Sequence, residues 1–517
     1  MPPVPGHPKP LARSDVERLK REAIGLTDAV RAGDHEARAR IEAHLALKEP
    51  FPHADALHVL ALENGHASWS ALTLGVEIAS TNRDGRRAWL ERAVYFGHAH
   101  VVERLLEVDS ALPGDDLGLR IALFDAAFVR RALVENPAAA TSLAGRRMPI
   151  GHLCFSQFAR LNPEERAMRE EASLEVAELL VEHGANVNES VAAEPGSPHR
   201  LSMLYGALGH AGNLALARWL LEHGANPNDD ESLYHATERE GPDAVRLLLR
   251  HGARIEGTNA ILRAVHVGNV EALRALVAAG GDPNAVASDR PSGEPIDAMT
   301  PLQLAAMVGA PRDVVEVLLD GGADPEIPWN GRAAYATARI HGSRGVADLL
   351  EARGHGVRAS GIDEVLASCA EGVAPASRLD VTDLSVEDRR LLIRVAGRPG
   401  RGAHLRALLA AGLSPSETDE MGMTALHMAL WEGIAANVTV LLEHGPDFGH
   451  VNAYGGDAVD TLLHGAEFCP AAGDREHVTC ATLLVEAGAP LPDDRSLAEC
   501  GNPDIVAFYE GVRALTA

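Results

Sequence analysis

The sequence is poor in the features that mark several other classes of protein. Its five cysteines are scattered over 517 residues without a recurring spacing, so we expect a reducing, cytoplasmic location and no disulfide-stapled secreted fold. The first ten residues lack the apolar stretch of a signal peptide, and no run approaches the ~18 apolar residues of a membrane span. Aromatic residues make up only 4%, so Ala, Leu and Val must fill the core, which favours closely packed helices.

Positive charge is also scarce. Lys+Arg 47 against Asp+Glu 73 gives a net charge of −26, which predicts repulsion from phosphate backbones and anionic lipid surfaces. We therefore expect neither nucleic acid nor a membrane as a partner. The common catalytic motifs are missing as well: there is no G-x-x-x-x-G-K-[ST], H-E-x-x-H, G-x-S-x-G or C-x-x-C.

One helical segment recurs along the chain. In each copy, apolar residues at i, i+3 and i+4 give a helix with one buried stripe, and a following Gly ends it in the left-handed conformation. The copies are spaced loosely around a period of ~33 residues. The clearest copies are 176–188, 216–228, 244–256, 272–284 and 314–326.

A second, shorter helix precedes several of these segments. Thr300 is placed to cap such a helix, with Pro301 at its first position, and Thr424 occupies the same place in another copy. Together the two helices form a helix–turn–helix unit.

These units resemble ankyrin repeats. The residues that follow the family's D-x-x-G-x-T-x-L-H pattern are Asp419, Gly422, Thr424, Leu426 and His427. The resemblance covers the chain from about residue 88 to its end, and weaker units are similar to a functionally uncharacterised bacterial group of ankyrin proteins.

The resemblance implies that Thr and His tie adjacent repeats together through hydrogen bonds. Because this chain has Ala425 in place of the family's Pro and Gln303 in place of its His, we expect those ties to be incomplete.

The predicted fold is an all-α ankyrin-repeat solenoid of about ten to twelve helix pairs with a helical N-terminal cap. The predicted divisions are a disordered N-terminus at 1–11, a helical cap or module at 12–80, the solenoid at 88–495 and a C-terminal capping helix at 496–517. A small partner-binding module is the alternative interpretation of 12–80.

Four polar insertions interrupt the repeats, and each is either a contact surface or a tolerated solvated loop. They are 157–172, 189–200, 285–297 and 465–480. The last of these places His464, Cys469, His477 and Cys480 close together. Thiolates and imidazoles are zinc ligands, but the spacing does not match a compact finger, and we predict no metal site and no cofactor.

The resemblance also implies that the residues before the Gly closing each first helix face a concave groove. We therefore predict a non-enzymatic scaffold that binds a protein partner through this concave groove and the hairpin fingers between repeats, and the acidic chain favours a partner with a basic surface. The alternative is an enzyme or metabolite-binding protein that uses a pocket around His210, Glu238 and His266. The predicted partner-binding residues are Tyr95, Phe96, His210, Glu238, Arg239, His266, Met307, Val308, His341, Trp431 and Glu432.

Overall fold

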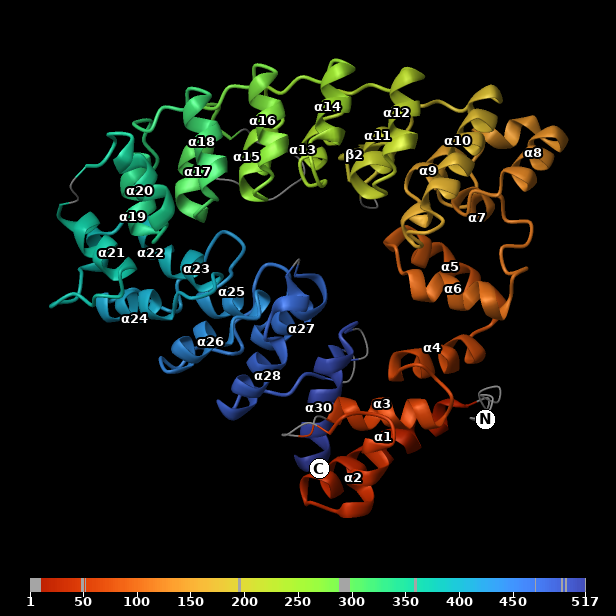
Figure 1. The fold of residues 1–517 in the computed structure, drawn as a ribbon, viewed down its shortest axis with the longest axis horizontal. Coiled ribbons are helices and arrows are strands. Elements are labelled where there is room, and N and C mark those ends of the chain that lie inside the picture. Colours follow the sequence, from red (N-terminus) through yellow and green to blue (C-terminus); the bar gives the residue numbers. More distant parts are fainter. Residues whose placement is uncertain are drawn as a thin grey trace. The chain divides into compact units, whose positions relative to one another are not determined.

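A computed structural model describes residues 11–47, 51, 53–193, 197–287, 298–357, 360–469, 471–493, 496–497 and 500–516. The predicted all-α solenoid of helix pairs is confirmed (Figure 1). The predicted disorder at 1–11 falls almost wholly outside the described residues. The chain forms two compact units, which we call the central unit (81–338 and 343–357) and the terminal unit (1–80, 339–342 and 358–517).

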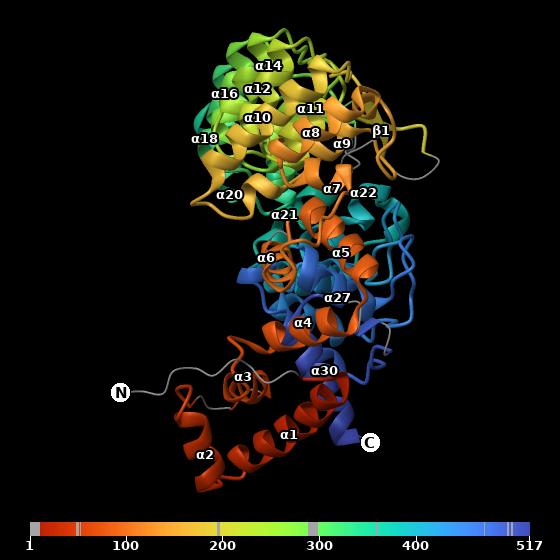
Figure 2. The same ribbon diagram turned by 90° about the vertical axis from the view of Figure 1, so that its right-hand side faces the viewer.

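The central unit is a ladder of paired helices. In Figure 1 the second helices from α10 to α18 lie side by side in one row and the first helices form a parallel row, and Figure 2 shows several of them one behind another. Its elements are α5 (Arg83–Phe96), α6 (Ala99–Val108), α7 (Leu117–Ala122), α8 (Ala126–Glu135), η1 (Pro137–Thr141), α9 (Pro149–Cys154), η2 (Phe158–Arg160), α10 (Arg166–Glu182), β1 (Ser190–Ala192), β2 (Arg200–Ser202), α11 (Met203–Tyr205), η3 (Gly206–His210), α12 (Leu214–Glu222), α13 (Ser232–Ala236), α14 (Asp243–Arg250), α15 (Ala260–His266), α16 (Val270–Ala278), α17 (Pro301–Val308), α18 (Arg312–Asp320) and α20 (Arg344–Ala352). Helix α19 (Ala334–Ile340) straddles the boundary between the units.

Helix ends follow the predicted signals. Thr300 accepts a hydrogen bond from the Gln303 backbone N–H, Pro301 is the first residue of α17, and Thr424 caps the helix that follows it. Asn213 and Asn269 cap the second helices α12 and α16 in the same way. The core of the central unit is continuous from Ile121 to Leu350 and consists mainly of Ala, Leu and Val, as the composition predicts.

The ties between repeats differ from the prediction in one of the two copies. Gln303 Nε2 donates to the carbonyl oxygens of Ile327 (2.9 Å) and Arg332 (2.8 Å), and Thr337 Oγ1 donates to Gln303 Oε1 (2.8 Å). The expectation of an incomplete tie is therefore wrong for Gln303, because an amide offers two donors and an acceptor where imidazole offers one of each.

The tie is incomplete in the other copy. His427 Nδ1 lies 2.7 Å from Thr424 Oγ1, but its buried Nε2 has no hydrogen-bond partner in the part of the chain that the structure describes.

The terminal unit joins the two ends of the sequence. Its elements are α1 (Arg13–Arg31), α2 (His35–Glu42), α3 (His53–Glu63), α4 (Trp69–Ser80), α21 (Ile362–Ala370), η4 (Val381–Asp383), α22 (Val386–Arg389), α23 (Leu391–Ala396), α24 (Gly402–Ala411), α25 (Ala425–Trp431), α26 (Ala435–Leu442), α27 (Ala458–Phe468), η5 (Ala472–Asp474), α28 (His477–Glu486) and α30 (Pro503–Thr516). The core of α1–α4 includes Ala507 of α30, and Lys20 Nζ lies 2.8 Å from Glu510 Oε1. The role of 12–80 as a cap on the first repeat stays a prediction.

The insertions take different forms. Residues 189–200 contribute to the antiparallel hairpin β1–β2, with Ser190 paired to Ser202. Residues 157–172 hold η2 and the start of the long helix α10, and 465–480 connect α27 to α28. Most of 285–297 falls outside the described residues. Among the helices that the structure describes, none has the length and apolar character needed to cross a membrane.

Candidate functional site

Most of the predicted groove residues lie at the ends of the first helices, and we call this set the inner row. Each turn is closed by a glycine in the left-handed region, with φ of 77° at Gly97 and 63° at both Gly212 and Gly433. Phe96 is 52% exposed and His266 is also exposed. The half-buried members are Tyr95, His210, Glu238, Arg239, Met307, Val308, Trp431 and Glu432.

His341 does not fit the prediction of an exposed groove residue, because it is only 5% exposed. Residues 339–342 belong to the terminal unit, where Ile340 joins the core and Gly342 lies against the guanidinium of Arg401. Side chains of that unit therefore cover this turn.

His210 is held against Tyr95, far away in the sequence. Its Nε2 donates a hydrogen bond to the Tyr95 carbonyl oxygen (2.8 Å), and the two rings lie 4.3 Å apart. His210 ends η3, a π-helical turn in which the Ala211 N–H donates to the Gly206 carbonyl five residues earlier. A Cβ at Gly206 would lie 2.7 Å from the Phe155 ring, so glycine permits this close approach. Short π-helical turns are frequent at functional sites.

Three arginines surround this pair, and we call Arg147, Arg160 and Arg239 the arginine cluster. Arg147 lies over the Tyr95 ring, 4.3 Å from its centroid. A Cβ at Gly212 would meet Arg239 Nη1 at 2.9 Å and Arg160 Cδ at 3.3 Å, so these two side chains cover the turn after His210.

The electrostatics at His210 follow from this arrangement. Burial lowers the pKa of His210, and the positive charges of Arg147, Arg239 and Arg160 lower it further, against the hydrogen bond to Tyr95 that raises it. The imidazole is therefore neutral at pH 7.

A second cluster, which we call the acidic cluster, lies on α13 and its neighbours. The carboxylate of Glu231, only 1% exposed, lies between His199 Nε2 (3.0 Å) and His235 Nε2 (3.3 Å). The other ring nitrogen of His235 lies 3.0 Å from Glu238 Oε2, and Glu238 Oε1 accepts from Arg263 Nε (2.9 Å).

The hydrogen bonds and charges within the acidic cluster shift the pKa values of His235 and Glu238 in opposite directions. Burial opposes the charged form of His235, but hydrogen bonds to Glu231 and Glu238 outweigh it and raise the pKa of His235. Burial likewise acts to raise the pKa of Glu238, and the hydrogen bond and charge of His235, with the charge of Arg263, hold that pKa below its usual value.

The pocket proposed around three inner-row residues is not assembled as one site. His210 contacts Tyr95, Glu238 contacts His235 and Arg263, and His266 is exposed. Within the residues that the structure describes, no three His, Cys, Asp or Glu side chains are grouped so that they could hold a metal ion.

The inner-row residues of the terminal unit contact the insertion at 465–480. His477 Nε2 donates to the Trp431 carbonyl oxygen (3.0 Å), and the ring of His464, just before the insertion, lies 5.3 Å from the Trp431 ring. Cys469 Sγ and Arg475 Nη2 lie 3.7 and 3.4 Å from Glu432 Oε2. The insertion therefore braces this part of the inner row.

The thiols of this region are not activated. Cys480 is fully buried, and burial raises the pKa of Cys480 to about 12. Burial also raises the pKa of Cys469 and Cys500. Neutral thiols are poor nucleophiles and poor metal ligands at pH 7.

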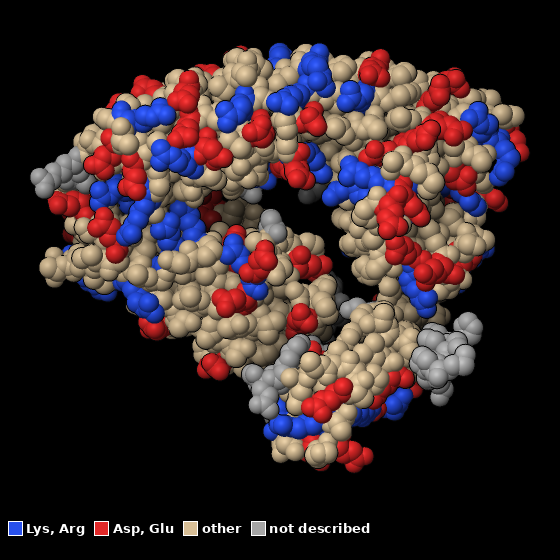
Figure 3. Space-filling model, in the orientation of Figure 1, with Lys and Arg blue, Asp and Glu red and all other residues tan. Residues whose placement is uncertain are grey.

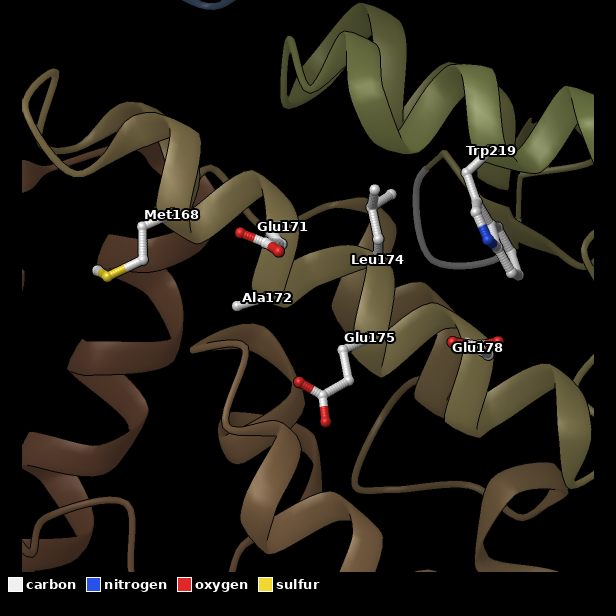
Figure 4. A pocket seen from close by; sticks show the side chains of 7 residues that line it. All are labelled: Met168, Glu171, Ala172, Leu174, Glu175, Glu178 and Trp219. Atoms are coloured by element: carbon white, nitrogen blue, oxygen red, sulfur yellow. The ribbon is translucent and has the colours of Figure 1, made fainter.

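An open depression of about 420 Å³ lies on the second helices α10 and α12 (Figure 4). Figure 4 shows Glu171, Glu175 and Glu178 along α10, with Trp219 reaching from α12. A smaller depression of about 270 Å³ lies beside the β1–β2 hairpin and includes Ser202 and Asp229. Neither depression includes an inner-row residue.

Sequence reasoning missed several members of both clusters. Glu231, His235 and Glu238 are spaced i, i+4 and i+7, the spacing of one helix face, and this signal was available. Arg160 falls in the insertion at 157–172, for which a contact surface and a tolerated solvated loop were both open interpretations. Arg147 comes from the loop before α9, and no sequence signal connects it to Tyr95.

Comparison with known proteins names the repeat. Residues 203–287 match the family model described as "Ankyrin repeats (3 copies)", and residues 297–330 match "Ankyrin repeat". The chain contains ankyrin repeats. A similar solved structure is the human ASB11 ankyrin repeat domain, at 20% identity over 50% of this chain and 99% of that chain, with a TM-score of 0.22. A search of curated proteins finds no match. The residues of the two clusters that fall within the match at 203–287 are Glu231, His235, Glu238, Arg239 and Arg263.

Proposed function

We propose that this chain is a non-enzymatic scaffold that binds a protein partner through the inner row and the loops between repeats. Ankyrin repeats are generally protein–protein interaction modules, and stacked repeats present extended binding surfaces.

The single observation that carries the proposal is the composition and exposure of the inner row near Tyr95. Phe96 is 52% exposed and packs edge-on against Tyr95 at 4.9 Å, with Arg147 stacked over the same tyrosine. Aromatic and arginine side chains contribute most of the binding energy at protein interfaces.

The enzyme alternative has less support. The polar atoms of His235 and Glu238 form hydrogen bonds with each other and with neighbouring side chains, so these two residues are poorly placed to exchange protons with a substrate. The partly basic partner and the cytoplasmic location stay predictions.

Affinity capture with mass spectrometry tests the proposal. We expect proteins that co-purify with the wild type from a lysate of the source organism to be lost with the double variant Phe96→Ala, Trp431→Ala. The matched control is Val134→Ala, Met168→Ala, which removes side chains 75% and 61% exposed on the second helices α8 and α10. Equal capture by the two double variants would contradict the proposal.

A further inference from the structure

The arginine cluster is unusual because none of its three guanidiniums forms an ion pair with a carboxylate of the described residues. Among the described residues, no Asp or Glu oxygen lies within 4.0 Å of a guanidinium nitrogen of Arg147, Arg160 or Arg239. Arg160 Nη1 lies 3.4 Å from Gln157 Oε1, Arg239 Nη2 donates to the Gly209 carbonyl, and Arg147 stacks on aromatic rings.

Neighbouring arginines are paired. Arg166 donates to the carbonyl of the same Gly212 that the cluster covers, yet its Nε lies 2.8 Å from Glu170 Oε1. Arg169 Nη2 lies 2.6 Å from Glu165 Oε2. The missing counterions are therefore a property of the cluster and not of this part of the chain.

The carboxylates that could neutralise the cluster are occupied. Glu165 and Glu170 pair with Arg169 and Arg166, and Glu238 pairs with His235 and Arg263. Asp, Glu, Lys and Arg side chains are interspersed over the surface seen in Figure 3, as expected for a surface on which most charges have a counterion nearby.

The cluster also has an unused donor. Arg239 Nε is buried and has no hydrogen-bond partner in the described part of the chain. Burial and the charge of Arg160 lower the pKa of Arg239, and the charge of Glu238 opposes this only in part. Repulsion between the guanidiniums and the missing hydrogen bond of Arg239 Nε are both unfavourable. A bound anion would reduce the repulsion and could accept the hydrogen bond.

The net charge of −26 does not prevent anion binding at this place. At physiological ionic strength the Debye length is about 8 Å, so remote carboxylates are largely screened. The charges of all three guanidiniums act on His210 at short range.

The surroundings indicate an anion carried by a peptide. Beside the cluster lie the exposed ring of Phe96 and the half-buried ring of Tyr95, which offer apolar contact to a chain. A guanidinium presents paired N–H donors that match a carboxylate.

We propose that the arginine cluster, with Tyr95 and Phe96, is a binding site for an acidic peptide segment, whose carboxylates pair with Arg147, Arg160 and Arg239. This inference rests on the proposed function and specifies the chemistry of the partner at this part of the inner row. The basic surface favoured by the net charge would contact the chain elsewhere.

The test is fluorescence anisotropy of the full chain with fluorescein-labelled hexaglutamate, alongside hexaglutamine. We expect saturable binding of hexaglutamate only, weakened when NaCl is raised from about 50 mM to about 500 mM. The triple variant Arg147→Gln, Arg160→Gln, Arg239→Gln should weaken binding by about tenfold or more, the value of one charge-assisted contact.

The matched control is Arg130→Gln, Arg274→Gln, Arg312→Gln. These arginines have side chains 56%, 58% and 67% exposed on second helices of the same unit, and each lies within 4 Å of a glutamate. Both triple variants change the net charge equally, so unchanged binding by the control would support the site. Equal loss in both, or no saturable binding by the wild type, would overturn it.

A third peptide, with three phosphoserines alternating with serines, separates carboxylate from phosphate. Binding of this peptide about tenfold tighter than hexaglutamate would overturn the carboxylate assignment. Failure of hexaglutamate together with loss of capture in the Phe96→Ala, Trp431→Ala variant would overturn the site and leave the proposed function standing.

Discussion

The acidic cluster and the arginine cluster are neighbours in the central unit, where Glu238 and Arg239 are adjacent residues, and they differ in how their charges are paired. In the first, Glu231 and Glu238 use their oxygens on two histidines and an arginine, and His235 uses both ring nitrogens. In the second, three guanidiniums lie around His210, whose pKa is lowered, and form no ion pair with a carboxylate of the described residues.

The difference shows that residue type alone does not mark a binding site. His and Glu at helical spacing suggest proton-transfer chemistry, yet here they form a closed network that holds the hairpin residue His199 to α13. Arginines on an acidic protein suggest ordinary surface charges, yet the three arginines of the arginine cluster form no ion pair. A charge without an ion pair, or a buried donor without a hydrogen bond, is therefore a better indicator of a binding site than residue type.

We expect the largest effect from removing the carboxylate of Glu231, at the centre of the acidic cluster. Glu231→Ala leaves His199 and His235 without the carboxylate that they share. We expect the free energy of unfolding to fall by about 3 kcal/mol. This is the lower end of the range for a broken buried ion pair, because an imidazole left without its partner can release its proton. Hydrogen exchange of 199–238 measures this loss of stability, because the two units can open separately.

The control for that change is Glu240→Ala, which removes an exposed carboxylate from the turn after α13. If both variants exchange at the wild-type rate, the acidic cluster does not stabilise the repeat.

A similar contrast between satisfied and unsatisfied hydrogen-bonding groups exists between Gln303 and His427, which occupy the same position in two repeats. Gln303→His introduces the side chain that the ankyrin resemblance favours, but imidazole cannot serve Ile327, Arg332 and Thr337 at once. We expect the free energy of unfolding to fall by about 1–2 kcal/mol, because at least one of these buried polar groups is left without a hydrogen-bond partner. The reverse change, His427→Gln, should alter stability by less than about 0.5 kcal/mol. Urea denaturation of both variants measures the difference, and a larger loss for His427→Gln would reverse our ranking.

Removing one arginine from each cluster sharpens the comparison further. Arg263→Gln breaks the pair with Glu238, whose side chains are 17% and 23% exposed, and should cost about 1 kcal/mol. Arg160→Gln removes a charge that repels its neighbours, so stability should stay within about 0.5 kcal/mol of the wild type. Thermal midpoints measured side by side give the answer, and a greater loss for Arg160→Gln would show that the cluster has an internal counterion.

The smallest effect is the pH dependence, which has opposite signs in the two clusters. The pKa of His235 is raised in the folded chain, so its contribution is present below its unfolded pKa of about 6.5 and is lost as pH rises through the folded value. The pKa of His210 is lowered, so its neutral form favours folding near pH 7 and this contribution is lost as pH falls below about 6.5.

The variants His235→Gln and His210→Gln isolate these two contributions. His235→Gln should therefore cost more at pH 6 than at pH 8, and His210→Gln less at pH 5 than at pH 7. The midpoints of urea denaturation, measured for the wild type and both variants between pH 5 and pH 8, report the two contributions. If the midpoints of the two variants depend on pH in the same way, the charge environments of His235 and His210 are not opposed.

The sequence predicted the ladder well because each repeat carries its own signals. Thr300 and Pro301 start α17, Gly309 ends it, and apolar stripes form a continuous core. The inner row was located from the same local turns, and only His341 is hidden, since long-range packing of 339–342 covers it.

The site chemistry was predicted less well. Sequence reasoning grouped His210 with Glu238 and His266 because they come from successive repeats, and the structure gives each a different environment. The partner of His210 is Tyr95, more than a hundred residues away, and no periodicity predicts which rotamers converge across such a separation.

The amino-acid sequence by itself determined the helix pairs, their caps and turns, and the small-residue core, because these depend on contacts between residues close along the chain. Only the tertiary structure decided which charges are neutralised. Whether a carboxylate lies within 4 Å of a guanidinium depends on packing between helices, and that distance separates the acidic cluster, whose charges are paired, from the arginine cluster, whose charges form no ion pair among the described residues.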